Sequence, residues 1–449
     1  MCFRYQLFTN TTSIVREHQM GIIKIETTNS KLSYVLHKHP DRPLIRQIRN
    51  GYGICWFQDG SCYLYFTDDP FKNSFVGTPK EANEFDYLNM QQYTSPSMYL
   101  ALMQEFLNTC LKKTESEDVP SDCTINISQM VFSERLRRIF VERCTNIDIV
   151  TEPLEGTQHS KVSIVGKQVS LHYLSNFVCF CLMVAGKDEL EFDATQVTKY
   201  VSKMAEMDLP FYMRSRIALD LIKSPKDFER LKTVLNQSST QDMSIQFGGT
   251  QLQRRHFLYS HLAPFPRDIV DIGCGEGYHS TYFAGILSKK DLMIYAIDKD
   301  PDCLNSLSKK CTTKEITNIA TFSSLKEFCE SEPSSEDGFD VILSEVIEHM
   351  PLSDVCPFIN QILDTIDFRK VIISTPDKSF NQQFGLADHE FRHDDHHWEM
   401  TFSEFQDLVN KLIVERSVRN DIKVAFKNVG SRVGAAFVTS ACIITKLAV

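Results

Sequence analysis

Two stretches of the sequence carry side chains that could bind one divalent metal ion. Glu345-Val-Ile-Glu348-His349 offers two carboxylates and an imidazole, and a histidine-rich run follows at 389–397. If Glu345 begins a helical turn, Glu348 and His349 lie on the same face of that turn. Carboxylates combined with neutral imidazoles favour Mn²⁺, Fe²⁺, Co²⁺ or Mg²⁺ over a structural zinc ion. The alternative is a solvated acidic turn followed by a polar loop that happens to contain histidines.

An upstream stretch predicts a nucleotide site. Asp268-Ile-Val-Asp271-Ile272 is typical of a short buried strand, and it runs into Gly273-Cys-Gly275-Glu-Gly277. The next predicted strand, 293–297, ends in Asp298. Glycines after a first buried strand let the backbone approach a ligand, and an acid that ends the second strand can bind a ribose diol. The spacing is not the GxGxxG form that binds a pyrophosphate, and a purely structural glycine turn is the alternative.

Alternating strands and helices must position these residues. Beyond residue 250, short apolar strands alternate with helical segments, and this pattern predicts a parallel sheet covered by helices on both faces. The predicted strand at 339–343 delivers Glu345 at its C-terminal end, the edge at which such sheets bind ligands. Two further strands, near 421–427 and 435–445, are expected to close the chain.

The first half of the chain predicts a separate α+β domain. Period-two alternation predicts strands such as 21–26, and helical periodicity predicts helices at 98–111 and 174–185. The acidic segment 114–122 is predicted to be an exposed loop. Arg214, Arg216 and Lys223 could face a phosphate, although three basic residues on a helix are more typical of a solvated face.

Composition and local signals define the expected domain layout. A chain of 449 residues should hold two or three domains. We expect an N-terminal domain over 1–230, with a division into two subdomains near 114–124 as an option. A polar linker should occupy 231–250, and a C-terminal domain should follow over 251–449.

Charge and cysteine usage restrict the class of protein. A net charge of -10 argues against nonspecific coating of nucleic acid but allows a local basic groove. The 14 cysteines are scattered without a CxxC pair, which indicates a reducing compartment. The N-terminus lacks a secretory pattern, and the longest apolar run, 174–185, is too short to span a bilayer. We therefore expect a cytoplasmic protein that makes no membrane contact.

The glycine motif resembles that of a known class of enzymes. Asp271-x-Gly273-x-Gly275-x-Gly277 resembles motif I of class I S-adenosylmethionine-dependent methyltransferases, and Asp298 is similar to their ribose-binding acid. The resemblance implies an α/β fold with a Rossmann-like seven-stranded sheet. It also implies that Gly273 and Gly275 pass the methionine part of S-adenosylmethionine and that Asp298 takes its ribose hydroxyls. The end of the fourth strand, which carries Glu345, would then face the methyl acceptor.

The acidic stretch narrows the resemblance to one family. Residues 345–350, 373–376 with Phe380-Asn381, and 391–401 resemble the Hua-enhancer family of small-RNA 3′-terminal ribose 2′-O-methyltransferases. The resemblance implies four ligands for one Mn²⁺ or Mg²⁺ ion, namely Glu345, Glu348, His349 and His396. His393 is the rival for the fourth place, but His396 keeps the family's Asp-His pair before the aromatic-Glu step.

This resemblance also implies a reaction and a substrate. The 2′-OH of the last nucleotide of an RNA with free 2′,3′-hydroxyls would be methylated, with His349 and Glu348 as the catalytic candidates. Asp395 is expected to orient a neighbouring imidazole. The RNA would be a small silencing RNA or an RNA under repair, and its methylation would protect the end.

The N-terminal half resembles the family less closely. The segment 36–42 looks like part of the extra domain of two-domain bacterial members, which act in RNA repair beside an RNA end-healing and ligating enzyme. A Phe-Gly-Gly-Thr step at 247–250 replaces the family's aromatic-x-Pro-Pro, while Gln253-Arg254 remains. Trp398-Glu-Met-Thr401 replaces Phe-Glu-Trp-Thr. Two alternatives stay open: a methyltransferase that modifies a small molecule or protein without metal, and a non-enzymatic scaffold that binds RNA ends.

Overall fold

The computed structural model describes residues 21–49, 51–68, 94–144, 146–186, 192–333, 335, 337–415 and 422–447. By its contacts the chain divides into two compact units, Met1–Asp227 and Phe228–Val449. Every described helix is too short or too polar to cross a lipid bilayer.

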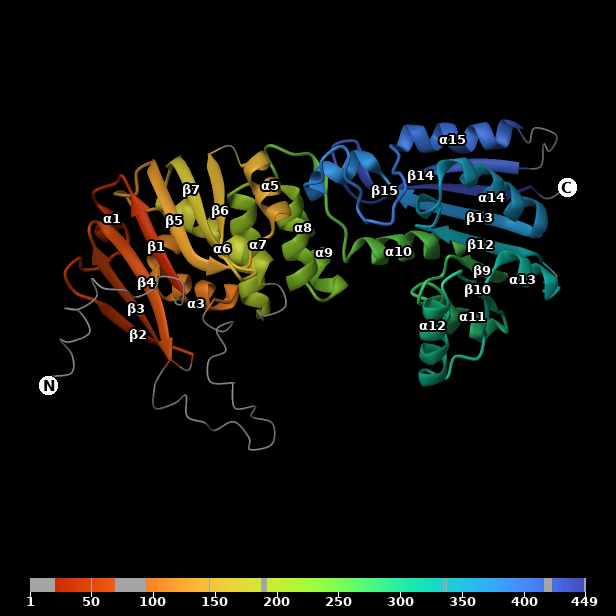
Figure 1. The fold of residues 1–449 in the computed structure, drawn as a ribbon, viewed down its shortest axis with the longest axis horizontal. Coiled ribbons are helices and arrows are strands. Elements are labelled where there is room, and N and C mark those ends of the chain that lie inside the picture. The colour runs from red at the N-terminus through yellow and green to blue at the C-terminus, as the bar shows by residue number, and fades with distance from the viewer. Residues whose placement is uncertain are drawn as a thin grey trace. The chain divides into compact units, whose positions relative to one another are not determined.

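The described part of the N-terminal unit contains an antiparallel sheet of seven strands in the order β2-β3-β4-β1-β5-β7-β6 (Figure 1). The strands are β1 (Ile22–Thr27), β2 (Leu44–Ile48), β3 (Gly51–Gln58), β4 (Ser61–Asp68), β5 (Ser121–Met130), β6 (Ile147–Pro153) and β7 (Ser160–Val169). The helices are α1 (Leu32–Val35), α3 (Pro96–Phe106), α4 (Asn108–Lys112), α5 (Glu134–Arg143), α6 (Leu171–Ala185), α7 (Ala194–Glu206) and α8 (Phe211–Leu221). Because β1 pairs with both β4 and β5, the sheet continues across 114–124, and the described residues there form one unit rather than two.

Two sequence predictions for this unit are corrected. Asp118, in the predicted exposed loop, is buried, and its carboxylate accepts the N–H groups of Leu171 and His172 at 2.7 and 2.8 Å. These bonds satisfy donors at the start of α6, which have no partner within the helix. Arg214 is fully buried and pairs with Asp208 at 2.8 Å, so its guanidinium does not face a phosphate in solvent.

The C-terminal unit is an α/β layer structure with the sheet order β11-β10-β9-β12-β13-β15-β14-β8. The strands are β8 (Met243–Ser244), β9 (Asp268–Ile272), β10 (Ile294–Ile297), β11 (Ile319–Phe322), β12 (Phe339–Ser344), β13 (Phe368–Pro376), β14 (Ile422–Val433) and β15 (Ala436–Lys446). The first five in this order are parallel, and β15, β14 and β8 are antiparallel. The predicted seven-stranded sheet with a closing antiparallel pair is therefore confirmed, and a two-residue strand extends it.

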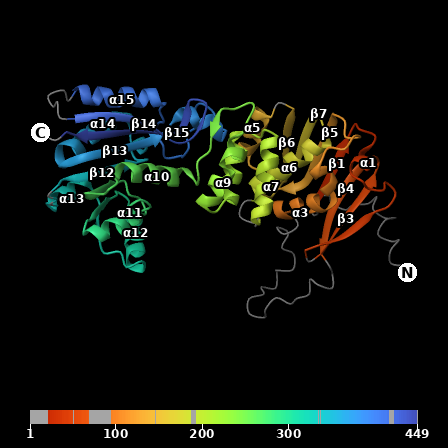
Figure 2. The ribbon, with the colours of Figure 1, turned by 180° about the vertical axis from the view of Figure 1, so that it is seen from behind.

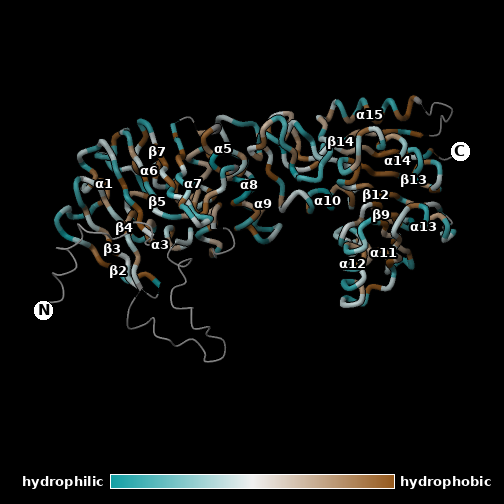
Figure 3. The backbone as a smooth tube through the Cα atoms, viewed as in Figure 1, coloured by the Kyte–Doolittle hydropathy of each residue, from teal (hydrophilic) through white to brown (hydrophobic). Residues whose placement is uncertain are grey.

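Strand alternation divides the core of this unit between the two faces of the sheet. Val270, Val341 and Val371 pack on one face with α14 (Leu352–Thr365) and α15 (Phe402–Glu415). Ile269 and Ile342, each one residue away, pack on the other face with α10 (Thr250–Leu262) and α11 (Ser280–Leu287). Figure 2 shows these two groups of helices on opposite sides of the sheet, and Figure 3 shows the hydrophobic residues along its central strands. The remaining helices are α9 (Pro225–Asn236), α12 (Pro301–Thr313) and α13 (Leu325–Glu330).

The segment that we expected to be a linker, 231–250, holds regular structure. It contains the end of α9 and the strand β8, in which Met243 and Ser244 pair with Val433 and Arg432 of β14. Gln253 of α10 also ties this segment down, because its side-chain amide donates to the carbonyl of Gly248 at 2.8 Å and accepts the N–H of Ser431 at 2.9 Å.

Candidate active site

The loop after β9 has a backbone conformation that requires glycine. Gly273, Gly275 and Gly277 have φ angles of +70°, +53° and +79°, which side chains other than glycine rarely adopt. A Cβ atom at Gly273 would lie 2.5 Å from Val346, and one at Gly277 would lie 2.3 Å from Leu307. A Cβ at Gly275 would meet nothing within 4 Å. The first and third glycines therefore allow close packing, and the second leaves open space.

That open space belongs to a cavity of about 740 Å³, which we call the glycine-loop cavity. Its walls are the loop itself, the start of α10, the first turn of α11, the end of α12, Ser344 at the end of β12 and the following Glu345. Asp298 is not among the residues that line the cavity, but its carboxylate supports the loop by accepting the N–H of Gly275 at 2.7 Å and that of Asp300 at 2.9 Å. The cavity lies at the C-terminal edge of the parallel strands, where sheets of this kind bind ligands.

Asp271 lies in β9 beneath the glycine loop. Its side chain is buried and accepts a hydrogen bond from the hydroxyl of Ser280. Burial raises the pKa of the Asp271 carboxyl to about 6, and the nearby charge of Asp298 adds to this. The carboxyl thus holds the start of α11 against the loop, and its charged form is unfavourable there.

This raised pKa predicts a pH-dependent stability. As the pH rises from 4 to 7, Asp271 loses its proton at a lower pH in the unfolded chain than in the folded protein. The free energy of unfolding therefore falls as the pH rises through 6. The difference from the ordinary pKa of 3.8 corresponds to about 3 kcal/mol. Asp271→Asn keeps an acceptor for Ser280 but has no proton to lose. As the pH rises from 4 to 7, its free energy of unfolding should therefore rise by about this amount relative to that of the parent. Urea unfolding at several pH values measures the difference, and two parallel pH curves would contradict it.

The acidic stretch does not begin a helical turn at Glu345, contrary to the sequence prediction. β12 ends at Ser344, Glu345 has a left-handed φ of +61°, and a short 3₁₀ turn then covers Ile347–His349. The left-handed residue directs the Glu345 side chain to α10, where its carboxylate pairs with Arg254 at 3.1 Å. Glu345 therefore lies outside the group that the other three predicted ligands form, although its charge still acts on Glu348 and its Oε1 has no hydrogen-bond partner.

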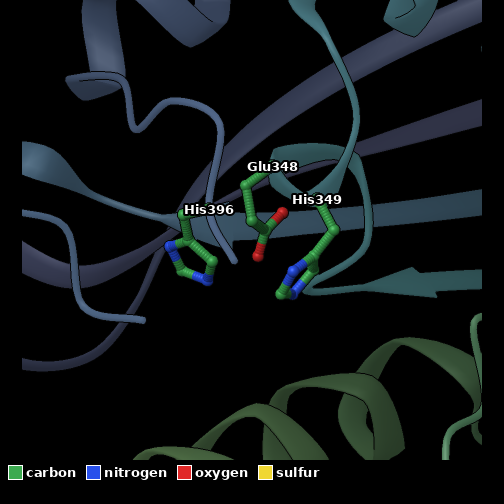
Figure 4. A group of neighbouring side chains, drawn as sticks. All are labelled: Glu348, His349 and His396. Atoms are coloured by element: carbon green, nitrogen blue, oxygen red, sulfur yellow. The ribbon is translucent and has the colours of Figure 1, made fainter. Parts of the chain in front are cut away.

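Three predicted ligands do come together. Glu348, His349 and His396 each place one potential ligand atom within 4.8 Å of the others, and Figure 4 shows their side chains converging. We call them the Glu348–His349–His396 group. Glu348 is fully buried, its Oε2 accepts from the Thr375 hydroxyl at 3.1 Å, and its Oε1 has no partner. Burial, and to a smaller extent Glu345, raises the pKa of Glu348 well above its usual range. A buried carboxylate oxygen without a partner, beside two imidazoles, fits a divalent cation.

Two carboxylates orient the histidines of this group. Nδ1 of His349 lies 3.0 Å from Asp395, and Nδ1 of His396 lies 2.7 Å from Glu399. With each Nδ1 occupied, Nε2 is the nitrogen left to bind a ligand. Carboxylate–histidine pairs of this kind are typical of metal sites, because they fix the tautomer and the ring orientation.

Sequence reasoning missed several residues that build the site. Glu399 is buried, and besides His396 its carboxylate accepts the Arg392 N–H at 2.7 Å and the Asn381 amide at 2.5 Å. The Arg392 guanidinium in turn donates to Asn381 Oδ1 at 2.8 Å. The spacing of three residues between His396 and Glu399 was the available signal. Arg254, by contrast, meets Glu345 only through the tertiary fold. His393 lies beside the group, with its ring 5.2 Å from that of His396.

Comparison with known proteins adds independent evidence. The Hen1 N-terminal domain model matches residues 22–240, and a methyltransferase domain model matches residues 269–367. A small RNA 2′-O-methyltransferase of Caenorhabditis elegans is 28% identical over 184 residues, which are 36% of this chain and 41% of that protein. The match thus spans less than half the length of this curated relative.

Solved structures match along nearly the whole chain. A chain of the Pnkp1/Rnl/Hen1 RNA repair complex gives a TM-score of 0.70 at 22% identity, and the match covers 95% of this chain and all of that one. A chain from a second structure of the Pnkp1/Rnl/Hen1 complex gives a TM-score of 0.66 at 21% identity, with the same coverage. At these identities the likeness establishes the fold. The two domain models show that this chain contains a Hen1 N-terminal domain followed by a methyltransferase domain.

Proposed function

We propose that the protein transfers a methyl group from S-adenosylmethionine to the 2′-OH of the 3′-terminal nucleotide of an RNA, with the help of one divalent metal ion. The observation that carries this proposal is the convergence of Glu348, His349 and His396, because Glu348 and His349 closely follow Val346, which lies against Gly273 of the glycine loop. The two ligand sites required by such a reaction are therefore neighbours.

The glycine-loop cavity fits S-adenosylmethionine. Its volume of about 740 Å³ is within the range of small-molecule sites, and the open space above Gly275 leaves room for backbone contact. When bound, the cofactor supplies an activated methyl group. We assign Gly273 and Gly275 to its methionine part and Asp298 to its ribose hydroxyls. In the structure the Asp298 carboxylate already holds the N–H groups of Gly275 and Asp300, so ribose binding would add to a preorganised acceptor.

The Glu348–His349–His396 group fits Mn²⁺ or Mg²⁺. When bound, such an ion supplies positive charge that lowers the pKa of a ribose hydroxyl. Glu348 and the two imidazoles would hold the ion. Glu345 would be the fourth ligand once its carboxylate had left Arg254 and bound the ion. His349 and Glu348 are the candidates to accept the hydroxyl proton. A histidine nitrogen that binds a metal cannot at the same time act as a base, so the two roles of His349 Nε2 exclude each other.

The proposed substrate is defined by its terminal ribose. A site that binds both hydroxyls of a vicinal diol selects the 3′-terminal nucleotide, because internal nucleotides have no free 3′-hydroxyl. The relatives point to a small RNA or an RNA under repair as the substrate. Methylation would protect the 3′ end of either kind of RNA. We also propose that residues 22–240 dock an RNA end-healing or ligating enzyme and that the protein acts in the cytoplasm.

A direct assay tests this function. Labelled S-adenosylmethionine is incubated with the full chain and a short RNA ending in 2′,3′-hydroxyls, beside a matched RNA ending in a 2′-deoxy nucleotide. Each RNA is assayed with Mn²⁺, with Mg²⁺ and with EDTA. We expect labelling only of the diol-ended RNA and only with metal. Equal labelling of both RNAs would assign the methyl group to another atom, and labelling in EDTA would contradict the metal's role. No labelling would favour a small-molecule or protein substrate.

A further inference from the structure

One wall of the glycine-loop cavity carries a cluster that the proposed chemistry does not use. The Arg255 guanidinium, from α10, lies 4.9 Å from the ring centre of Tyr278 and 4.3 Å from that of Tyr282. Tyr278 belongs to the loop before α11, and Tyr282 to the first turn of that helix. All three residues line the cavity. We call them the arginine–tyrosine cluster.

The tyrosine rings of this cluster are not part of the hydrophobic core. Tyr278 and Tyr282 remain 36% and 39% exposed although the guanidinium lies over both. Phe283, the next residue along α11, is completely buried and packs on the sheet. The Tyr282 ring meets that of Phe283 edge-on, with the ring centres 5.3 Å apart, but this packing within α11 does not account for the ring surface that stays exposed.

The lining of the cavity as a whole carries an excess of positive charge. The cavity is lined by four cationic side chains, Arg254, Arg255, Lys310 and Lys314, and by two acidic ones, Glu276 and Glu345, which leaves an excess of two. The two carboxylates are already engaged, Glu276 with Lys310 and Glu345 with Arg254. His279 adds no charge, since burial and the two arginines lower its pKa to about 3. On a chain with a net charge of -10, this cavity is suited to an anionic ligand.

Exposed aromatic rings beside unengaged cations are suited to single-stranded nucleic acid. Unpaired bases stack on tyrosine rings and on guanidinium planes, while lysine and arginine neutralise the neighbouring phosphates. We infer that the arginine–tyrosine cluster is a stacking platform for a base near the 3′ end of the RNA, with Lys314 facing the adjoining phosphate. This inference rests on the proposed function, and it adds the place at which the protein holds the RNA strand. Glu345 lines the same cavity, so a strand on this platform leads toward the loop that carries Glu348 and His349.

The test measures RNA affinity separately from methyl transfer. Fluorescence anisotropy with a 3′-diol RNA should give a dissociation constant about tenfold higher for Tyr282→Ala than for the parent. Tyr282→Phe should bind like the parent, because stacking does not need the hydroxyl. Tyr259→Ala is the matched control, since Tyr259 is an exposed tyrosine of α10 that packs against Phe265 and does not line the cavity. The KM for S-adenosylmethionine should be unchanged in all three variants.

A second set of RNAs identifies which base stacks on the arginine–tyrosine cluster. RNAs with one abasic nucleotide at each of the last four positions are bound to the parent and to Tyr282→Ala. At one position, removing the base should lower the affinity of the RNA for the parent about tenfold. The same change should leave its affinity for Tyr282→Ala almost unaltered. Uniform affinity of the parent across the series would overturn the platform, even if Tyr282→Ala failed to fold. A raised KM for S-adenosylmethionine with unchanged RNA affinity would assign the cluster to the cofactor instead. Absence of methyl transfer by the parent would refute the proposed function and leave the binding result to stand separately.

Discussion

Glu348→Gln should lower methyl transfer to a diol-ended RNA by roughly 1,000-fold while leaving S-adenosylmethionine binding intact. Glu348 is the buried member of the Glu348–His349–His396 group, and its Oε1 has no partner within the protein. Removing the charge removes a ligand from the proposed metal, whose contribution of several kcal/mol corresponds to about three decades in rate. The variant should also unfold at a higher urea concentration in the absence of metal, because the carboxylate it replaces is unfavourable when buried and charged.

Steady-state rates with saturating Mn²⁺ and equilibrium binding of the cofactor test this expectation. Glu276→Gln is the matched control, since Glu276 is an exposed cavity residue that pairs with Lys310. Glu345→Gln distinguishes two ligand sets. A loss as large as that of Glu348→Gln would support four ligands, and a small loss would leave Glu345 as the partner of Arg254 alone. Full activity of Glu348→Gln would refute the metal assignment.

Glu399→Ala should weaken Mn²⁺ binding by about 10- to 100-fold, the usual effect of removing a carboxylate that orients a ligating histidine. The buried Glu399 carboxylate accepts hydrogen bonds from His396, Arg392 and Asn381, so its loss frees the His396 ring and leaves the Arg392 N–H and the buried Asn381 amide without this acceptor. Glu399→Gln keeps one oxygen for His396 and Arg392 and should lose less. Isothermal titration of the full chain with Mn²⁺ measures the affinity without reference to turnover.

A nearby glutamate provides the control for this measurement. Glu404 accepts hydrogen bonds from Thr401 at the start of α15, so Glu404→Ala should alter stability slightly and Mn²⁺ affinity not at all. Equal Mn²⁺ affinities for Glu399→Ala and Glu404→Ala would show that the network around Glu399 has only a structural role.

Most of the C-terminal fold could be predicted because its strands are buried on both faces. Residues 339–343 are all buried, and apart from Asp340 they form the apolar run that is typical of such a strand. The strand β8 gives no such signal. It consists of two residues in a polar segment, and its pairing with β14 is decided by tertiary contacts. In the N-terminal unit, the helix predicted over 98–111 is interrupted at Leu107, a break that hydrophobic periodicity does not record.

The site shows the same division between local and tertiary information. The residue types of Glu348, His349 and His396 indicated ligands, and the structure brings these three side chains together. The left-handed conformation of Glu345 could not be foreseen, since glutamate rarely adopts a positive φ. Its pairing with Arg254 joins segments that are far apart in the sequence, and no spacing rule relates them.

The contact between Gly273 and Val346 has a consequence for how this protein could change. β9 and β12 are neighbouring parallel strands, so the loops that follow them leave the sheet side by side, and a Cβ on Gly273 would lie only 2.5 Å from Val346. In the proposed reaction this contact acts as a spacer that sets how far the methyl group must travel. A larger residue at 273 would push the two loops apart, and it would also disturb the contact proposed for the methionine part of the cofactor. The separation between the two proposed ligand sites therefore depends on the absence of a side chain at position 273.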